Sequence, residues 1–365
     1  MHLTFLSLTD FRSYKNAELV LRPGITTFIG SNGEGKTNFA EAIGYLAYLS
    51  SHRTGSDTPL IRLGCERAYI RAKVMNDDRE ELLEIEINNG RANRGRINQS
   101  PSRSTKELLG HLRAVLFTPE DLSLVKGDPS ERRDYLDKIL ISRTPRLAGT
   151  ITDYERVIKQ RNSLLKTRPN ERELVPWDGQ LAKLASQVIA ARLALVEELR
   201  PLVLNAYSKI AAGDDVNIEY KCSGDLKQRE ASEIEAEILL ALPELRRAEI
   251  ERGLSLIGPH RDDLLLTLGA TPVRGYASQG ESWSYALALR MGSYRLLSVE
   301  SMGEASEPIL ILDDVFAELD SVRRGALLEL IDSSEQVLVT AAVEADLPSE
   351  FSDRRIYVHE GSVRE

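Results

Sequence analysis

A glycine-rich loop between a predicted strand and a predicted helix constrains the fold of this chain most. Residues 30–37 read Gly-Ser-Asn-Gly-Glu-Gly-Lys-Thr, which matches the phosphate-binding pattern G-x-x-x-x-G-K-T at every position. The apolar run 25–29 precedes the loop, and the helix-like run 38–43 follows it. In this strand, loop and helix order the pattern indicates a nucleotide site, whereas an unrelated glycine-rich loop would lack the context.

The residue types in this loop suit a nucleoside triphosphate. Glycine lets the backbone turn so tightly that successive N–H groups face one phosphate, and the helix start adds a positive dipole end. Lys36 would reach the β- and γ-phosphates, and the Thr37 hydroxyl would bind Mg²⁺. The sequence therefore predicts binding of ATP or GTP. The expected nucleotide-binding residues are Gly30, Ser31, Asn32, Gly33, Glu34, Gly35, Lys36, Thr37 and Asn38.

Such a site needs a second acid on a neighbouring strand. The apolar run 309–312 ends at two carboxylates, Asp313 and Asp314. Asp313 is expected to bind Mg²⁺, because a hard ion prefers carboxylate oxygen. Asp314 is expected to polarise the attacking water, so Asp314 and Lys36 are candidate catalytic residues.

The order of predicted elements indicates an α/β fold with an insertion. Residues 1–120 are rich in short strands, residues 121–254 show apolar residues at helical spacing, and strands return after that. The short apolar strand 309–312 between helices is typical of a buried parallel sheet. We therefore expect a head domain from residues 1–120 and 255–365, with an inserted, mainly helical arm domain over 121–254.

Some local predictions accompany this organisation. The polar, turn-rich segment 88–105 is predicted to form a hairpin tip and a mobile loop. Pro201 and Pro243 are predicted to kink or end their helices, because proline has no backbone N–H. The helical region shows no sustained heptads, so a long coiled coil is not expected.

Composition is that of a soluble globular protein. The 365 residues include 42% hydrophobic and 28% charged residues. The two cysteines, Cys65 and Cys222, match no metal-binding spacing and suit a reducing compartment. The first residues lack the basic lead of a signal peptide, and no apolar run is long enough to span a membrane. We therefore expect a cytoplasmic location and no membrane contact.

The net charge of −9 does not by itself indicate a nucleic-acid partner, but two stretches are locally basic. Cations dominate residues 91–113, where Glu107 is the single acid, and no acid interrupts the cations of residues 156–168. Taken alone, either stretch also suits a solvated loop or helix face. The candidate DNA-binding residues within them are Arg91, Arg94, Arg96, Arg156, Lys159 and Arg161.

The segment before the predicted helix 282–299 resembles the Ser-x-Gly signature of ATP-binding-cassette ATPases. In those proteins a second subunit presents the signature serine, backbone N–H groups and a helix N-terminus to the γ-phosphate. A lone Ser-x-Gly is also a common helix N-cap, but here it lies one helix before Asp313. The residues expected to contact nucleotide in trans are Ser278, Gln279, Gly280 and Glu281, and residues 317–320 stand at the position of the dimer-contacting loop.

Taken together, the motifs resemble the RecF family of recombination mediators, which is related to SMC-type ATPase heads. They follow one another from residue 1 to about residue 340, so the resemblance covers nearly the whole chain. The segments that carry it are Asp10-Phe11-Arg12-Ser13-Tyr14, Gly35-Lys36-Thr37-Asn38, Phe117-Thr118-Pro119-Glu120-Asp121-Leu122, Gly258-Pro259-His260-Arg261-Asp262-Asp263, Ala277-Ser278-Gln279-Gly280-Glu281 and Leu312-Asp313-Asp314-Val315-Phe316.

The resemblance implies further roles. Arg12 would touch the nucleotide, and Glu120 would lie near Mg²⁺ or the attacking water as a third candidate catalytic residue. Arg53 is a candidate for stabilising charge on the nucleotide. His260 and Arg261 would support the site or the dimer face, although they also suit an internally satisfied polar cluster.

The chain departs from cassette transporters at three positions. Asp314 stands where transporters carry glutamate, and Glu281 stands where the signature usually ends in glutamine. After the last predicted strand, residues 339–342 offer no histidine at the transporters' switch position. A different γ-phosphate sensor, or none, is implied.

The resemblance implies an ABC/SMC-type ATPase head that forms an ATP-dependent homodimer and binds DNA. Expected cofactors are ATP and Mg²⁺, and expected activity is slow, DNA-stimulated ATP hydrolysis that opens the dimer. Expected partners are duplex DNA with single-strand gaps and mediators of the RecO and RecR type, which together promote recombinase loading. The alternatives are a transporter ATPase subunit, for which the switch histidine is missing, and an SMC-like structural protein, for which long heptad arms are missing.

Overall fold

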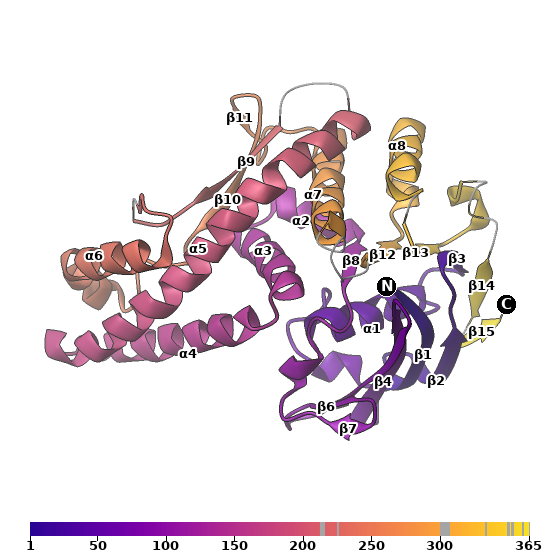
Figure 1. The fold of residues 1–365 in the computed structure, drawn as a ribbon, viewed down its shortest axis with the longest axis horizontal. Coiled ribbons are helices and arrows are strands. Elements are labelled where there is room, and N and C mark those ends of the chain that lie inside the picture. The colour runs from indigo at the N-terminus through magenta and orange to yellow at the C-terminus, as the bar shows by residue number, and fades with distance from the viewer. Residues whose placement is uncertain are drawn as a thin grey trace. The chain divides into compact units, whose positions relative to one another are not determined.

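The computed structural model places the chain in two compact units (Figure 1). Unit 1 contains Met1–Leu122, Asn205–Gly213 and Gln279–Glu365, and unit 2 contains Ser123–Leu204 and Asp214–Ser278. Residues 255–278, expected in the head domain, therefore lie in unit 2. The structure describes residues 1–211, 216–224, 226–299, 307–332, 334–348, 351, 354–359 and 361–364.

Unit 1 is built around a sheet in the order β15-β14-β3-β13-β12-β8. From β14 to β8 the neighbouring strands are parallel, while β15 is antiparallel to β14. Every residue of β8, β12 and β13 is buried, as the apolar run 309–312 predicted. The strands are β3 Gly24–Ile29, β8 Ala114–Phe117, β12 Ile309–Asp313, β13 Gln336–Ala341, β14 Arg355–His359 and β15 Ser362–Arg364.

A second, antiparallel sheet of unit 1 has the order β2-β1-β4-β5-β6-β7. Residues 94–97 pair with β5, so this part of segment 88–105 is a strand and not the mobile loop that was expected. The strands are β1 His2–Phe11, β2 Tyr14–Val20, β4 Arg67–Asn76, β5 Arg79–Asn88, β6 Arg94–Ile97 and β7 Ser100–Pro101.

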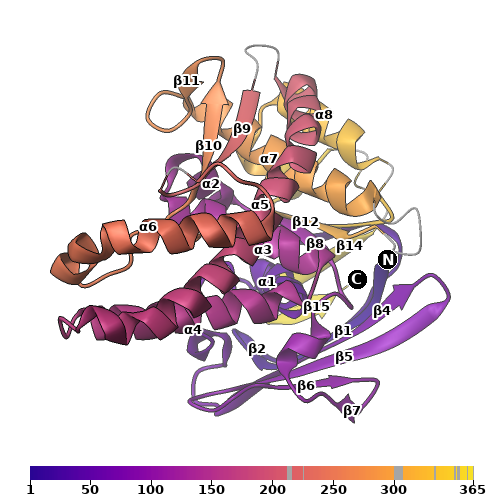
Figure 2. The same ribbon diagram turned by 60° about the vertical axis from the view of Figure 1, so that its left-hand side comes forward.

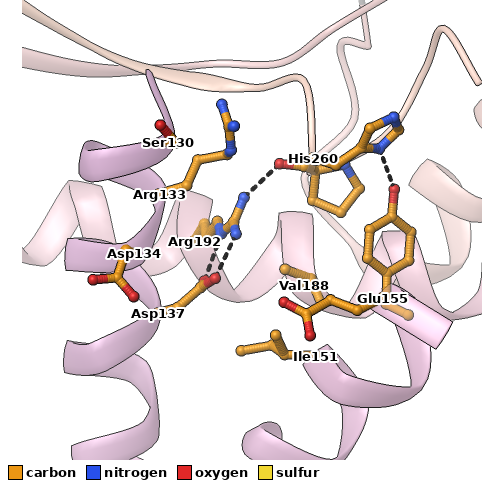
Figure 3. A pocket seen from close by; sticks show the side chains of 11 residues that line it. Ser130, Arg133, Asp134, Asp137, Ile151, Glu155, Val188, Arg192 and His260 are labelled. Carbon is orange, nitrogen blue, oxygen red and sulfur yellow. Dashed lines mark hydrogen bonds and ion pairs between the residues drawn. The ribbon is translucent and has the colours of Figure 1, made fainter. Parts of the chain in front are cut away.

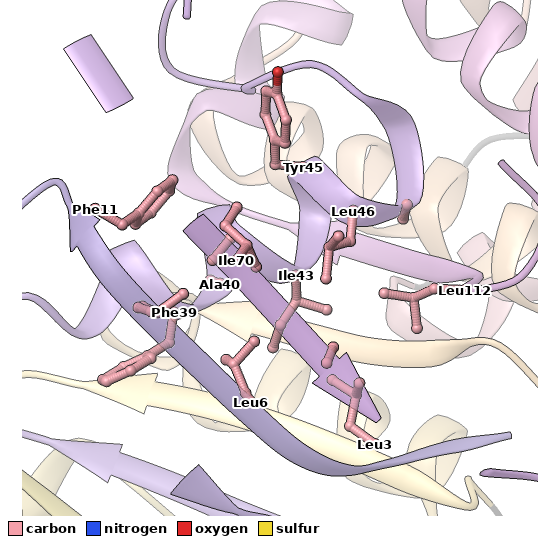
Figure 4. Packing of buried hydrophobic residues seen from close by; sticks show 14 of the residues in the cluster. Leu3, Leu6, Phe11, Phe39, Ala40, Ile43, Tyr45, Leu46, Ile70 and Leu112 are labelled. Carbon is pink, nitrogen blue, oxygen red and sulfur yellow. The ribbon is translucent and has the colours of Figure 1, made fainter. Parts of the chain in front are cut away.

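Helix α1, Lys36–Tyr48, joins the cores of the two sheets. Its residues Phe39, Ile43 and Leu46 belong to one hydrophobic cluster with Leu6 of β1 (Figure 4). The same cluster includes Ile311 of β12. Burial on several sides fixes the helix firmly, and its first residue is the loop lysine. The core thus positions the N-terminus of α1 at the end of β3.

Helices α7 and α8 also belong to unit 1, together with the last residues of α5. Helix α7 packs against β8, where Trp283 meets Phe117 edge to face with ring centroids 6.0 Å apart. The remaining elements are α7 Gln279–Val299, α8 Ser321–Ile331 and the short 3-10 helices η1 Thr58–Leu60, η2 Thr105–Leu108, η3 Pro119–Asp121, η5 Phe316–Glu318 and η6 Glu344–Asp346.

Unit 2 is mainly helical and carries one small sheet of order β11-β10-β9 (Figure 2). Its strands are antiparallel, and β9 was not predicted from the sequence. Among the described residues, no helix of either unit is long and apolar enough to span a membrane. The elements are α2 Leu122–Lys126, α3 Pro129–Arg143, α4 Leu147–Leu165, α5 Glu171–Ile210, α6 Ala231–Arg252, β9 Val216–Lys221, β10 Asp263–Leu268 and β11 Thr271–Pro272.

Of the two outcomes predicted for these prolines, the end of the helix is wrong, and the kink stays a prediction. Helix α5 continues through Pro201, and α6 continues through Pro243. A proline inside a helix costs about 3 kcal/mol through its lost hydrogen bond and ring clash. Buried side chains on both sides of Pro201, such as Leu199 and Val203, offset that cost by packing.

Candidate nucleotide-binding site

The loop 30–37 runs from the end of β3 into α1, as predicted. Gly33 and Gly35 have positive φ angles of 90° and 113°, which favour glycine. A Cβ on Gly35 would lie 2.7 Å from the Tyr14 hydroxyl, which donates to the Gly35 carbonyl at 3.1 Å. A Cβ on Gly30 would lie 2.3 Å from the Val358 carbonyl oxygen. The glycines are therefore required both by backbone conformation and by close neighbours.

Lys36 is nearly buried at the start of α1. Its Nζ donates to the Gly30 carbonyl at 2.6 Å and to the Ser31 carbonyl at 3.2 Å. The ammonium group is thus held over the loop by carbonyl oxygens. Phosphate oxygens are stronger acceptors for a charged donor and can replace these carbonyls.

The carboxylate of Asp313 meets two hydroxyl groups at the end of β12. Thr37 Oγ1 donates to Asp313 Oδ1 at 3.1 Å, and Thr340 Oγ1 from β13 donates to the same oxygen at 2.6 Å. Burial is the main cause that raises the pKa of Asp313 to about 6; the charges of Asp314 and Glu120 contribute to the rise, while the two hydrogen bonds oppose it. The site concentrates negative charge beside the loop.

The other two predicted acids lie next to Asp313. Asp314 has a φ of 53°, and its backbone N–H donates to Thr340 Oγ1 at 2.9 Å. Glu120 is exposed in η3, the 3-10 helix that follows β8. Because β8, β12, β13 and β3 are parallel neighbours, their carboxyl ends meet at one edge, where α/β sheets bind ligands.

Arg12 and Arg53 are both bound to Glu41 of α1. Arg12 forms a two-pronged ion pair, with Nε at 2.7 Å and Nη2 at 2.5 Å from the carboxylate oxygens. Arg53 Nη1 lies 3.5 Å from Glu41 and 3.3 Å from Asn38 Oδ1. Burial opposes ionisation of Glu41, but hydrogen bonds from Arg12 and Ser51 and the nearby guanidinium charges lower the pKa of its carboxyl.

The signature-like segment leads into α7. Ser278 and Gln279 are exposed, and Gly280 and Glu281 are partly buried. A Cβ on Gly280 would lie 2.9 Å from Nη2 at the end of the Arg323 side chain, so this side chain of α8 lies close to the start of α7. Arg323 Nε also donates to Ser284 of α7 at 2.8 Å.

The start of α8 is fixed by the segment before it. Asp320 caps the helix by accepting from the Arg323 backbone N–H at 2.9 Å, and the same two side chains form an ion pair. The segment 317–320 and the start of α7 are thus connected through Arg323.

His260 and Arg261 lie in unit 2, where the segment 258–263 binds its neighbouring helices. The Tyr154 hydroxyl lies 2.5 Å from His260 Nδ1, and Arg192 donates to the Pro259 carbonyl at 2.8 Å (Figure 3). These groups line a cleft of about 270 Å³, in which Arg192 is paired with Asp137. Burial lowers the pKa of His260 to about 4. The internally satisfied polar cluster, the alternative considered for this segment, is what the structure shows.

The basic candidates divide into exposed and buried side chains. Arg91, Arg94 and Arg96 are exposed, as are Lys159 and Arg156, although Arg156 lies 3.3 Å from Asp153. Arg161 is fully buried and contacts Asp178, Glu249 and Ser255. Its prediction as a DNA-binding residue is therefore wrong, because no part of its side chain reaches solvent.

Sequence reasoning missed three participants in this site. Thr340 holds both acids, Glu41 holds both arginines, and Arg290 of α7 forms an ion pair with Asp121 at 2.5 Å. Glu41 had a signal, since it is an acid inside an otherwise apolar stretch of helix. Thr340 had only its position at the end of a strand.

Comparisons with known proteins identify the family. The protein-family model described as RecF/RecN/SMC N terminal domain matches residues 2–360 of this chain. The DNA replication and repair protein RecF of Streptomyces avermitilis is 52% identical across 100% of this chain and 99% of its own. The chain belongs to the RecF family. RecF of Frankia alni is 50% identical, with 100% of this chain and 99% of its own covered.

Solved structures agree with this membership. Two structures of the recombination mediator protein RecF, described as RecF-ATPrS and RecF-ATP, match this chain with TM-scores of 0.90 and 0.91 at 28% sequence identity. Each match covers 99% of this chain, and it covers 97% of the RecF-ATPrS chain and 96% of the RecF-ATP chain. The SmcHead bound to the C-winged helix domain of ScpA shares the fold at a TM-score of 0.58 and 17% identity, over 100% of this chain and 96% of its own. The fold is that of an ABC/SMC-type ATPase head, as predicted.

Proposed function

We propose that this RecF-family chain is an ATP-dependent, dimerising DNA-binding protein of DNA repair and replication. The observation that carries the proposal is the meeting of Lys36, Thr37 and Asp313 at the carboxyl edge of the parallel sheet. Relatives support it, since two RecF structures are described as RecF-ATP and RecF-ATPrS, and curated relatives are DNA replication and repair proteins.

Mg²⁺ fits the oxygen atoms of this site. Thr37 Oγ1 and Asp313 Oδ1 lie 3.1 Å apart and are the hard ligands that this ion prefers. Burial is the main cause of the raised pKa of Asp313, so its carboxylate lacks solvation and would be stabilised by a nearby positive charge. Bound Mg²⁺ would supply that charge and neutralise the triphosphate.

Hydrolysis would use the acids beside Asp313. Because Thr340 fixes the Asp314 backbone, the Asp314 carboxylate is a positioned acceptor for a proton of the attacking water. Glu120 supplies a second carboxylate at the same edge of the sheet. Lys36 would stabilise charge on the phosphates, so that removal of its ammonium group weakens both binding and turnover.

ATP would join two copies of the chain. The N-terminus of α7, with Ser278, Gln279, Gly280 and Glu281, would face the γ-phosphate bound by the loop of the other copy. Arg323 of α8 supports this helix start, because its Nε donates to Ser284 Oγ at 2.8 Å. Because these γ-phosphate contacts exist only in the dimer, ATP would favour closure and slow hydrolysis would favour opening.

DNA would bind through its phosphates to exposed arginines. Arg94 and Arg96 lie on one face of β6 and, with Arg103, line a cavity of about 600 Å³ at the edge of the antiparallel sheet. The acids across the strands from them, Glu86 and Glu84, are already paired with Arg67 and Arg71. The surplus charge suits a polyanion, with strong salt dependence and little sequence preference.

Arg91 beside β6 and Arg156 and Lys159 on α4 remain candidate contacts in this proposal. Gapped duplex DNA is the proposed substrate, with stimulation of ATP hydrolysis by DNA. Mediators of the RecO and RecR type are the proposed partners in recombinase loading, in line with relatives described in the RecFOR pathway.

ATP-dependent dimerisation tests the proposal. The mass of the protein in solution is measured by light scattering without nucleotide, with ADP, and with a non-hydrolysable ATP analogue, each with and without duplex DNA. We expect a dimer only with the ATP analogue, and more dimer with DNA. A protein that stays monomeric at high concentration with the analogue would contradict the proposal.

A further inference from the structure

A fully buried carboxylate lies just behind the nucleotide loop. Glu41 belongs to the second turn of α1 and has no solvent exposure. An isolated buried charge is very costly, so its partners must be close and charged or hydrogen-bonded. Its partners come from outside the helix: Arg12 from the turn between β1 and β2, and Ser51 and Arg53 from the segment after α1.

Arg12 is held tightly by this carboxylate. Besides its two bonds to Glu41, its Nη1 donates to the Pro59 carbonyl at 2.9 Å, and only 16% of its side chain is exposed. The Ser51 hydroxyl adds a bond of 2.5 Å to Glu41. Arg12 therefore acts as a fixed support for Glu41, rather than as a side chain that can turn toward a ligand.

Arg53 is held far more loosely. Its contacts to Glu41 and Asn38 measure 3.5 Å and 3.3 Å, and 37% of its side chain is exposed. Asn38 follows Thr37 directly, and its own amide donates to Ser13 Oγ at 2.9 Å, which fixes its direction. The Arg53 guanidinium thus lies at the first turn of α1, next to the proposed phosphate site.

The charges in this cluster do not cancel. Two guanidinium groups share the single carboxylate of Glu41, so one positive charge is left over. Arg12 makes the shorter, two-pronged bonds to Glu41, so the positive charge of Arg53 is the one less neutralised and more available to bind an anion.

We propose that Glu41, supported by Arg12 and Ser51, is a positioning residue that holds Arg53 ready for the nucleotide phosphates. Arg12 itself then acts indirectly, through Glu41, and not by touching the nucleotide. The inference rests on the nucleotide-binding part of the proposed function and assigns a role to a residue that does not contact the ligand. Pre-positioning lowers the entropy that a long side chain loses on binding.

A double-mutant cycle tests this role. ATP affinity is measured with a fluorescent ATP analogue and Mg²⁺, at protein concentrations too low for dimerisation. We expect Arg53→Gln and Glu41→Gln each to weaken binding by about tenfold, and the double variant to be no weaker than Arg53→Gln alone. The matched control is Glu84→Gln, which removes an arginine-paired carboxylate of β5 and should leave the affinity unchanged.

Thermal unfolding of each variant separates positioning from stability. If Glu41 only stabilises the fold, Glu41→Gln will weaken binding equally in the presence and absence of Arg53, and the proposal is overturned. Should Glu41→Gln fail to fold, Arg53→Gln and Ser51→Ala still test the proposal: unchanged ATP affinity in either variant overturns it, and weaker binding in both supports it.

Failure of the proposed function gives a different pattern. A protein that binds ATP with Arg53-dependent affinity but never dimerises contradicts the ATP-joined dimer and leaves the role of Glu41 intact. If the protein dimerises with ATP but Arg53→Gln and Glu41→Gln leave its ATP affinity unchanged, this inference alone is contradicted.

Discussion

Replacing Arg161 tests how much of unit 2 depends on a buried charge network. Arg161 has no solvent exposure and makes three short contacts, at 3.0 Å to Asp178, 2.6 Å to Glu249 and 2.6 Å to Ser255. Burial acts to lower the pKa of its guanidinium, but Glu249 and Asp178 outweigh that effect and raise the pKa. The side chain therefore stays charged and joins α4, α5 and α6.

The magnitude follows from what Arg161→Ala would leave behind. Asp178 keeps Arg246 at 2.5 Å, so this acid remains paired. Glu249, which is fully buried, keeps only the Leu256 backbone N–H at 2.9 Å among the contacts seen in the described part of the chain. Removing one partner of a buried ion pair costs about 3–5 kcal/mol. Since domains are stable by about 5–15 kcal/mol, the loss is a large part of the total.

Urea unfolding followed by far-UV circular dichroism measures this loss. We expect Arg161→Ala to lower the free energy of unfolding by about 3–5 kcal/mol. The control is Arg156→Ala on the same helix, whose 66% exposed side chain and surface pair should contribute about 0–1 kcal/mol.

The double variant Arg161→Met with Glu249→Leu should recover most of the stability, because both charges leave together. A stability of Arg161→Ala within about 1 kcal/mol of the parent, or a double variant as unstable as the single one, would refute the reasoning.

Four other outcomes follow. Lys36→Met should weaken ATP binding by more than about tenfold in a nucleotide titration with unchanged melting temperature, because the phosphates lose their charged donor. Ser278→Arg should bind ATP normally yet stay monomeric in light scattering, and a normal dimer would contradict the assigned signature. Replacing Arg94 and Arg96 together with alanine should reduce the slope of log affinity for DNA against log salt by about 0.9 per lost phosphate contact. Burial lowers the pKa of His260 from its ordinary value of 6.5 to about 4 in the folded chain, so the unfolded chain binds an extra proton between these values. Stability should therefore fall as pH drops through that window, by at most about 3 kcal/mol, and His260→Asn should flatten the fall.

The local parts of the site could be predicted from the sequence. The loop 30–37 and the acids Asp313 and Asp314 are local patterns, and each follows a buried strand whose neighbours are parallel. Parallel strands place such ends at one edge of the sheet, so two segments far apart in the sequence could be brought together by argument alone.

Partnerships between side chains could not be predicted in the same way. Arg161 was assigned to a solvated or DNA-binding face because its neighbours in the sequence are basic. The buried positions of α4 include Tyr154, Val157, Arg161 and Leu165, so Arg161 occupies the apolar stripe of the helix. The burial of Arg161 could therefore have been predicted from the helical spacing of the apolar residues in α4. Its acidic partners could not, because they lie on α5 and α6 and no local sequence pattern points to them.

The end of β13 bears on why one chain would need a second copy. The Thr340 hydroxyl donates its single hydrogen to Asp313 and accepts the Asp314 N–H, so it has no donor left for a phosphate. The residues that follow, Ala341 and Ala342, carry no polar side-chain group. The strand end that carries histidine in transporters therefore positions the acids here and offers no side-chain donor to the γ-phosphate. In the proposed dimer, contacts to the γ-phosphate would then come from outside this strand, and the helix start at Ser278–Glu281 of a second copy is the one proposed here to supply them.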